Sequence, residues 1–476
     1  MKIRTMAFGL LAATLGAAGP LLAAATDNGE ARFRDIYKEL VETNTTLSSG
    51  SCTLAAERMA AHLRSAGFPE SNLYLFTAPD HPKEGGLVAT FPGRDPKAKA
   101  ILLLAHIDTV EAKREDWARD PFKLVEESGN FYARGASDDK AMAAIWVDLL
   151  VRLSAEKKRP RRTLKLALTC GEETIGAFNG AQWLVNNKRE LVDAEFALNE
   201  GAWGEKDSEG RKLLLSVLAG EKTAQNYRME VTNPGGHSSR PVKDNAIYRL
   251  SAALMRLSAY DFPPEFNDAN RAYFTAMAPI QAAKGESAIA EAMTAMVQNP
   301  GDEKSITLVS AKDPSWNGML RTTCVATMLD GGHASNALPQ RAGAIVNCRI
   351  FPGTTQEIVR QRLEEIVADP AVKVTTLEIR GPAEMPLPLT PAILDPVKKL
   401  AAQFWPGVPV VPMLQPGATD GQFFNAAGIP AYGISGVFLG PDLGNVHGLN
   451  EYINVESLMQ DRDFLYRLVK IYADQP

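Results

Sequence analysis

The sequence contains a His-x-Asp pair at the end of an apolar segment. Ile101 to Ala105 are all apolar, and His106 and Asp108 follow directly. An unbroken apolar run of this length indicates a strand of a parallel sheet that is buried on both faces. Ligands of such sheets lie beyond the carboxyl ends of the strands. A neutral imidazole there can bind a metal ion, and a carboxylate two residues later can hold the other ring nitrogen.

Glutamates follow two further apolar segments. Glu172 and Glu173 come shortly after Leu164–Thr169, and Glu200 directly follows Phe196–Asn199. Adjacent glutamates are common on surface helices, but here they follow a segment that is expected to be a buried strand. Because the carboxyl ends of parallel strands lie at one edge of a sheet, we expect these side chains to gather near the His-x-Asp pair. Histidine with carboxylates is the ligand set of zinc or a similar divalent ion.

Two adjacent aspartates supply a further carboxylate. Asp138 and Asp139 follow a glycine and small residues, and they precede a helical pattern from Ala141 to about Ala155. An aspartate at the start of a helix commonly caps the free N–H groups of the first turn. Two in succession exceed what a cap requires, so one of them is a candidate metal ligand.

These motifs, in this order, resemble those of the co-catalytic zinc metallopeptidases and aminoacylases of peptidase family M20. The family includes glutamate carboxypeptidase, aminoacylase, carnosine-type dipeptidases and carboxypeptidase S. The resemblance extends over nearly the whole chain after its first residues. The matching motifs are His106-x-Asp108, Gly135-x-x-Asp138-Asp139-Lys140, Glu172-Glu173, Asn199-Glu200-Gly201 and Val446-His447-Gly448.

The resemblance implies a cofactor of two Zn²⁺ ions, with Co²⁺ or Mn²⁺ as alternatives. It assigns five metal ligands in this sequence: His106, Asp138, Glu173, Glu200 and His447. Asp138 would bridge the two ions and be followed by a cis peptide bond. His106 and Glu200 would complete one site, and Glu173 and His447 the other. Two such ions about 3.5–4 Å apart polarise a carbonyl and lower the pKa of water toward about 7.

The resemblance also implies three catalytic roles. Glu172 would be the general base, which takes a proton from water and passes it to the leaving nitrogen. Asp108 would hold the imidazole of His106. His237 would stabilise the oxyanion in the active site of a partner subunit, which predicts a homodimer. By its Pro-Gly-Gly-His pattern alone, His237 would instead be an ordinary turn residue.

Four residues are implied in substrate binding. Asn336 precedes an apolar-apolar-Pro motif, and Arg349 lies on the next expected strand, where its guanidinium would bind the substrate carboxylate. Without the resemblance, a surface ion pair would explain Arg349 equally well. Gly417 and Thr419 match a Gly-Gly-Thr-Asp loop that lies near this carboxylate. Pro416 replaces the first glycine of that loop and removes one N–H donor.

The length of 476 residues exceeds one ordinary hydrophobic core and predicts at least two domains. The resemblance implies an α/β catalytic domain, with a mixed, largely parallel sheet flanked by helices, interrupted by an α+β ferredoxin-like lid or dimerisation domain. The expected bounds are 26–222 and 382–476 for the catalytic domain and 223–381 for the lid, with an insertion near 260–317. Helical patterns cover Glu30–Glu42, Thr53–Ala66, Asn179–Val192 and Pro391–Phe404.

The first 25 residues have the pattern of a signal peptide. Lys2 and Arg4 form a short basic region, Met6 to Leu22 are small or apolar, and Ala23 to Ala25 offer a cleavage site. We therefore predict a secreted or periplasmic protein, without a stable membrane anchor, because the apolar stretch is short and rich in alanine and glycine. Removing the two basic residues changes the net charge from −5 to −7. A mildly acidic chain argues against nucleic acid as a partner.

Four cysteines are too few to form a disulfide scaffold in a chain of this length. Cys170 and Cys348 lie in apolar, strand-like segments, where buried free thiols are common. A Cys324–Cys348 bridge is an open alternative. Export would place all of them in an oxidising compartment.

Together these features predict an exported dinuclear zinc hydrolase that cleaves an amide bond next to a free carboxylate. The substrate would be a peptide, which makes the protein a carboxypeptidase or dipeptidase, or alternatively an N-acyl amino acid. A periplasmic binding protein without catalysis is a remote alternative. Glu172 argues against it, because a storage site has no use for a second glutamate beside the ligand.

Overall fold

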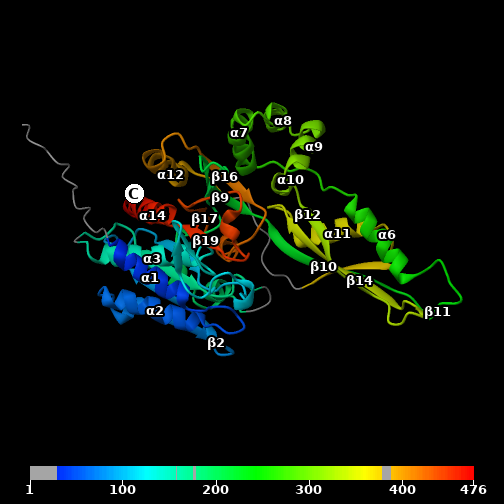
Figure 1. Ribbon diagram of the computed structural model, residues 1–476, viewed down its shortest axis with the longest axis horizontal. Coiled ribbons are helices and arrows are strands. Elements are labelled where there is room, and N and C mark those ends of the chain that lie inside the picture. Colours follow the sequence, from blue (N-terminus) through cyan, green and yellow to red (C-terminus); the bar gives the residue numbers. More distant parts are fainter. Residues whose placement is uncertain (1–28, 157, 175–177, 378–386, 476) are drawn as a thin grey trace, which may run out of the picture.

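In the computed structural model, the structure describes residues 29–156, 158–174, 178–377 and 387–475. The chain forms a catalytic part and a lid, which extends to the right in Figure 1. The predicted signal peptide and the predicted boundary at 381/382 lie outside the described residues. Within the described ranges, no helix combines the length and the apolar character that a membrane span requires.

The catalytic part contains a ten-stranded mixed sheet. Its strands are β1 (Leu73–Ala78), β2 (His81–Phe91), β3 (Ile101–His106), β6 (Leu164–Thr169), β7 (Phe196–Asn199), β8 (Gly204–Lys206), β9 (Lys212–Glu221), β16 (Val410–Gln415), β17 (Ala431–Ile434) and β18 (Phe438–Leu439). The order is β1-β2-β6-β3-β7-β17-β9-β8-β18, and β16 pairs with β9. The central strands β6, β3, β7 and β17 are parallel, whereas β1 and β2 pair antiparallel to their neighbours. Strand β9 pairs antiparallel with β17 and β8 and parallel with β16. The predicted α/β fold with a mixed, largely parallel sheet is confirmed.

Helices cover both faces of this sheet. One face packs against α1 (Glu30–Glu42), α2 (Cys52–Ser65), α3 (Lys140–Ser154), α12 (Pro391–Phe404) and α14 (Val455–Asp474). The other face packs against α4 (Gly180–Asn187), α5 (Arg189–Val192) and α13 (Gly421–Ala426). In β3, Leu103 belongs to the first core, and Leu102 and Leu104 belong to the second. Each such leucine contributes about 2 kcal/mol by its burial, which explains the unbroken apolar segment.

The helix predicted over Asn179–Val192 is two helices. Asn179 caps α4 by accepting a hydrogen bond from the N–H of Gln182. Lys188 then leaves the helical conformation, with φ −141° and ψ 41°, and α5 begins at the next residue. The predicted helix at Thr53 begins one residue earlier, because Ser51 is its N-cap.

The lid is a four-stranded antiparallel sheet with helices on one face. It contains β10 (Thr223–Thr232), α6 (Ala246–Ser258), β12 (Thr323–Gly331), β14 (Arg341–Ile350), α11 (Gln356–Val367) and β15 (Val372–Thr376). The strand order β12-β14-β10-β15 and this element order are those of a ferredoxin-like fold. The hairpin-like pair β11 (Gly236–His237) and β13 (Ala337–Leu338) lies at the end of the lid that is remote from the large sheet (Figure 1).

The lid insertion is a bundle of four helices: α7 (Asp268–Ala283), α8 (Ser287–Gln298), α9 (Glu303–Lys312) and α10 (Pro314–Leu320). It extends slightly beyond the predicted end at residue 317. Its core includes Leu214 of β9, together with Val411 and Met413 of β16. The insertion therefore belongs to the lid in sequence but packs on the sheet of the catalytic part.

All four cysteines form disulfide bonds. Cys324 and Cys348 join β12 to β14, which confirms the open alternative. Cys52 and Cys170 are also bonded, so the expectation of a buried free thiol at Cys170 is wrong. These two cysteines are 118 residues apart in sequence, and only the packing of α2 beside β2, the neighbour of β6, brings them together.

Candidate metal centre and active site

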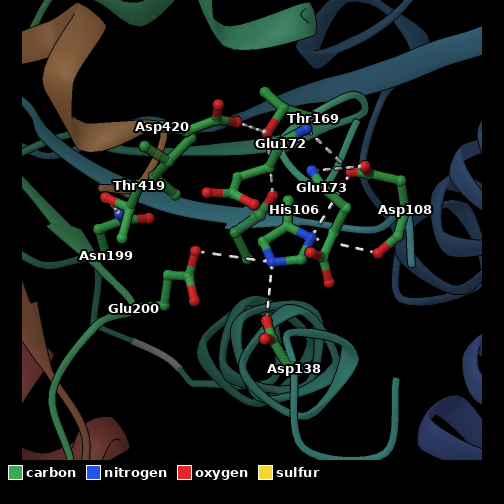
Figure 2. Close-up of polar contacts among 12 residues, drawn as sticks. His106, Asp108, Asp138, Thr169, Glu172, Glu173, Asn199, Glu200, Thr419 and Asp420 are labelled. Atoms are coloured by element: carbon green, nitrogen blue, oxygen red, sulfur yellow. Dashed lines mark hydrogen bonds and ion pairs between the residues drawn. The ribbon is translucent and has the colours of Figure 1, made fainter. Parts of the chain in front are cut away.

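The five predicted metal ligands form two groups that share one aspartate. Figure 2 labels four of these ligands, all except His447. His106, Asp138 and Glu200 form the first group, and Asp138, Glu173 and His447 form the second. In each group, one ligand atom per residue lies within 4.8 Å of the others. His106 ends β3, Glu173 lies beyond β6, and Glu200 directly follows β7. The strand-end argument therefore predicts the position of these three correctly.

Asp138 presents a different oxygen to each group. Its Oδ1 lies 3.0 Å from Nε2 of His106, and its Oδ2 lies 3.2 Å from Nε2 of His447. Glu200 Oε1 is 3.5 Å from His106 Nε2, and Glu173 Oε2 is 2.9 Å from His447 Nε2. This is the arrangement expected of a carboxylate that bridges two cations. The peptide bond between Asp138 and Asp139 is cis, as expected.

The charges of this cluster favour bound cations. Burial, and then the charge of neighbouring acidic groups, raises the pKa of Glu200 well above its usual value. Hydrogen bonds to Asp138 and Glu173 raise the pKa of His447 to about 10. Among the described residues, the three ligand carboxylates have only the two histidines as ion-pair partners. Two divalent cations would compensate the excess negative charge, so the donor set fits a dinuclear site.

Asp108 holds more than the imidazole. His106 Nδ1 lies 3.2 Å from the backbone oxygen of Asp108 and 3.5 Å from its carboxylate. The same carboxylate accepts hydrogen bonds from the N–H groups of Glu173 at 3.0 Å and Glu172 at 3.4 Å (Figure 2). Asp108 therefore fixes the orientation of His106 and the backbone of the glutamate pair together.

Glu172 lies beside the metal ligands without belonging to either group. Its side chain lines the same cavity as Asp138 and Glu200. Figure 2 shows its carboxylate on the same side of His106 as Glu200. Burial raises the pKa of Glu172 well above its usual value, although His106 acts in the opposite direction. A buried carboxyl group with a raised pKa is suited to accept and return a proton.

Glu451 is a functional residue that sequence reasoning did not identify. It is 1% exposed and accepts a hydrogen bond from Arg134 Nη1 at 2.6 Å. It also accepts the N–H groups of Gly135, Ser137 and Asp138, at 3.0, 2.8 and 3.2 Å. These contacts hold the loop that presents the bridging aspartate. The only signal for Glu451 in the sequence is its position, four residues after the predicted ligand His447.

Thr419 lies in a second buried network. Its hydroxyl donates a hydrogen bond to Glu221 Oε1 at 2.5 Å and accepts one from Asn199 Nδ2 at 2.9 Å. Glu221 also accepts the N–H of Thr419 at 3.0 Å, and burial raises its pKa to about 7. The hydroxyl of Thr419 thus forms its hydrogen bonds with other groups of the protein. Asn199 precedes a metal ligand, so this network connects the loop of Gly417 and Thr419 to the metal centre.

A cavity of about 390 Å³ joins the metal ligands to predicted substrate residues. Arg349, from β14 of the lid, lines it together with Gly417 and Thr419. The remainder of the lining includes apolar side chains from several segments around the metal centre: Met142, Ala202, Trp203, Val437, Leu439, Leu443, Val446 and Ile453. The cavity therefore has a cationic group and a largely apolar lining, which we call the apolar wall, beside the same carboxylate cluster.

His237 and Asn336 lie away from the metal centre. Ser238 donates its N–H to the backbone oxygen of Asn336 at 3.1 Å, so the two residues are close to each other at the remote end of the lid (Figure 1). His237 is exposed, and its Nδ1 accepts a hydrogen bond from Ser239. Neither residue lines the cavity of the metal ligands in the described part of the chain. Within one chain they do not meet the metal centre, and their predicted roles require a second copy.

A family model for "Peptidase family M20/M25/M40" matches residues 102–471. The chain belongs to this family. It is therefore a hydrolase of amide bonds, and the alternative of a non-catalytic binding protein is set aside. The matched residues include all five predicted metal ligands.

Named relatives of this M20 protein act on more than one substrate class. The human "N-fatty-acyl-amino acid synthase/hydrolase PM20D1" is 29% identical over 441 residues, which cover 90% of this chain and 85% of that protein. Rat aminoacylase-1A is 26% identical over 82% of this chain and 84% of its own length. A probable carboxypeptidase S-like protein of Dictyostelium discoideum is 27% identical over 81% and 74% of the two chains.

Solved structures share the M20 fold. The M20 metallo-carboxypeptidase Sso-CP2 of Sulfolobus solfataricus superposes with a TM-score of 0.69 and 19% identity, covering 93% of this chain and 99% of that one. A dinuclear metal-binding M20 peptidase of Bacillus subtilis has a TM-score of 0.58 and 13% identity, covering 93% and 97%. At these identities the likeness shows the fold alone.

Proposed function

We propose that this M20 protein is a dinuclear zinc hydrolase that cleaves N-acyl amino acids with an apolar acyl group. The observation that carries this proposal is Asp138, whose two oxygens face two separate ligand pairs. One member of each pair, Glu200 and His447, lines the same cavity as Asp138. Two Zn²⁺ ions held by these ligands would supply Lewis acidity toward the amide carbonyl and toward water. Co²⁺ or Mn²⁺ would suit the same nitrogen and oxygen donors.

The proton transfers fall to Glu172. It takes a proton from the attacking water and delivers that proton to the leaving nitrogen, so one group serves as base and then as acid. Asp108 supports this step because its carboxylate holds the N–H groups of Glu172 and Glu173. Glu173 points to His447 at 2.9 Å. The two adjacent side chains therefore have separate tasks, one in metal binding and one in proton transfer.

Arg349 is the proposed anchor of the substrate carboxylate. It lines the cavity together with Gly417, and its positive charge helps to lower the pKa of the neighbouring Lys222, after the larger effect of burial. A guanidinium can bind a carboxylate with two parallel hydrogen bonds. This contact would place the scissile amide, which is next to that carboxylate, against the metal ligands.

The apolar wall favours an acyl chain on the other side of the amide. Trp203, Leu439 and Leu443 contribute to this wall, and Leu443 is also partly exposed at the surface. The printed names of the human and rat relatives refer to N-fatty-acyl amino acids and to an aminoacylase. A peptide with an apolar residue before the scissile bond remains the second candidate, since the Dictyostelium relative is named for carboxypeptidase S.

The test compares N-acyl amino acids of increasing chain length with dipeptides, using purified protein of measured metal content. We expect kcat/KM to rise with the length of the acyl chain and to exceed that for dipeptides. The Glu172→Ala variant should keep its metal ions and lose at least a thousandfold in kcat. Unchanged turnover in this variant would remove Glu172 from the mechanism, and a preference for dipeptides would favour the second candidate.

A homodimer is also proposed, with His237 and Asn336 acting in the partner's site. Strand β12 is an edge of the lid sheet, and its side chains Val325, Met328 and Leu329 are 60%, 67% and 70% exposed. Such an apolar edge strand suits pairing with a second copy. Mixing His237→Ala with Glu172→Ala protein should restore activity through hybrid dimers. No recovery in a mixture shown to contain hybrid dimers would contradict action in trans.

We further propose export with cleavage after Ala25. The two disulfide bonds support this, because such bonds persist in oxidising compartments. N-terminal sequencing of the protein from its native compartment should begin at Thr26.

A further inference from the structure

The Cys52–Cys170 disulfide lies directly before the glutamate pair. Cys170 follows the last residue of β6, and only Gly171 separates it from Glu172. Its sulfur is bonded to that of Cys52, the first residue of α2, with a Cα–Cα distance of 6.1 Å. The bond is therefore a covalent tie between the N-terminus of a helix and the segment that carries the proposed general base.

The helix end that anchors this tie is itself well fixed. Cys52 is 2% exposed, and Ala55, Ala56 and Met59 of α2 are fully buried in the main core. The hydroxyl of Thr53 donates to the backbone oxygen of Pro82 at 2.7 Å and accepts the N–H of Gly85 at 2.9 Å. The start of α2 is thus bound to β2, which leaves the disulfide with a rigid support.

The segment after Cys170 has a tight path. Gly171 has φ +95°, and a side chain there would lie 1.8 Å from the backbone oxygen of Phe178. The oxygen of Gly171 accepts a hydrogen bond from Asn179 Nδ2 at 3.2 Å, and the oxygen of Cys170 accepts the N–H of Gly180 at 2.7 Å. Glycine brings conformational freedom to the position directly before the base, so the neighbours of Gly171 must supply the restraint.

Two restraints act on Glu172 and Glu173. Asp108 holds their N–H groups through hydrogen bonds, at 3.4 and 3.0 Å. The disulfide fixes the residue that precedes Gly171. Small errors in the position of a catalytic group cost large factors in rate, because the group must lie within hydrogen-bonding reach of the proton that it transfers.

We propose that the Cys52–Cys170 disulfide positions the glutamate pair, and that Cys52 and Cys170 are positioning residues of the active site. The proposal rests on the role of Glu172 given above. The second disulfide, Cys324–Cys348, lies within the lid sheet and provides a matched control.

The experiment compares C52A/C170A with C324A/C348A in the full-length, metal-loaded protein at 25 °C, where thermal unfolding shows both to be folded. We expect kcat of C52A/C170A to fall at least tenfold with KM within twofold of wild type. Backbone hydrogen exchange at Glu172 and Glu173 should become at least tenfold faster. The control should keep kcat within twofold and leave exchange in this segment unchanged.

Three results would overturn the proposal. Unchanged kcat and unchanged exchange in C52A/C170A, with a lower melting temperature only, would make the bond purely structural. Equal losses in the control would point to general destabilisation. If C52A/C170A does not fold, the C52S variant takes its place, and failure of that variant to fold would make the bond a requirement of folding instead. Since hydrogen exchange needs no substrate, it decides the question even if the proposed activity is wrong.

Discussion

Replacing Glu451 is expected to damage both the stability of the protein and its metal centre. Its carboxylate accepts hydrogen bonds from Arg134 and from the N–H groups of Gly135, Ser137 and Asp138, and it is almost fully buried. Hydrogen bonds to a charged group contribute about 1.5–3 kcal/mol each, although such values are not additive. Removing one partner of a buried ion pair costs about 3–5 kcal/mol, because the other charge remains buried.

We therefore expect Glu451→Ala to lower the free energy of unfolding by about 4 kcal/mol. Glu451→Gln keeps one carbonyl oxygen and the side-chain shape, so its loss should be about half as large. The affinity for the metal ions should fall about 10–100-fold in Glu451→Ala, because the loop that presents Asp138 loses its support. Urea denaturation and metal competition titrations measure the two effects.

A surface ion pair provides the matched control. Glu126 Oε2 lies 3.0 Å from Arg34 Nη1, and its side chain is 51% exposed. Glu126→Ala should cost less than about 1 kcal/mol and leave metal affinity unchanged. The reasoning is refuted if Glu451→Ala costs no more than this control, or if it keeps wild-type metal affinity while unfolding more easily.

Three further predictions concern pH, substrate binding and the metal ions. The pKa of Glu221 is raised from 4.5 to about 7, so its contribution to stability is complete below pH 4.5 and is lost as the pH rises through 7. Between pH 4.5 and pH 8, the unfolding free energy of Glu221→Gln should therefore rise by about 3 kcal/mol relative to that of wild type. A difference that stays constant with pH in urea titrations would contradict this. Arg349→Lys should raise KM at least tenfold for substrates with a free carboxylate while leaving KM for their methyl esters nearly unchanged, and equal effects on both would remove Arg349 from carboxylate binding. Chelation should lower the melting temperature, since cations at 100 times their Kd stabilise by about 3 kcal/mol, and an unchanged melting temperature in calorimetry would argue against tightly held ions.

The local elements were predictable because their signals are local. The apolar segments of β6 and β7 have the predicted bounds, and α1 and α12 begin and end as their periodicity indicates. The positions of His106, Glu173 and Glu200 followed from the rule that ligands lie at the carboxyl ends of parallel strands. His447 carries no such signal in its loop, and only the family resemblance identified it.

The residues that the sequence analysis did not identify contact segments that are remote from them in sequence. Cys52 and Cys170 are 118 residues apart, so their pairing depends on how α2 packs in three dimensions. Glu451 and Glu221 bind backbone N–H groups and a hydroxyl rather than metal, and no residue pattern marks a carboxylate for that task. The contacts of the helical insertion with β9 and β16 likewise join segments that are remote in sequence.

The order of the ligands along the chain has a consequence during protein synthesis. Four of the five lie between His106 and Glu200, but His447 and the supporting Glu451 come near the C-terminus. A ribosome must therefore synthesise the chain as far as His447 before the second cation has its full set of donors. A nascent chain, or one truncated before His447, lacks one of the five ligands and so has no complete amidase centre with which to cleave itself or its neighbours.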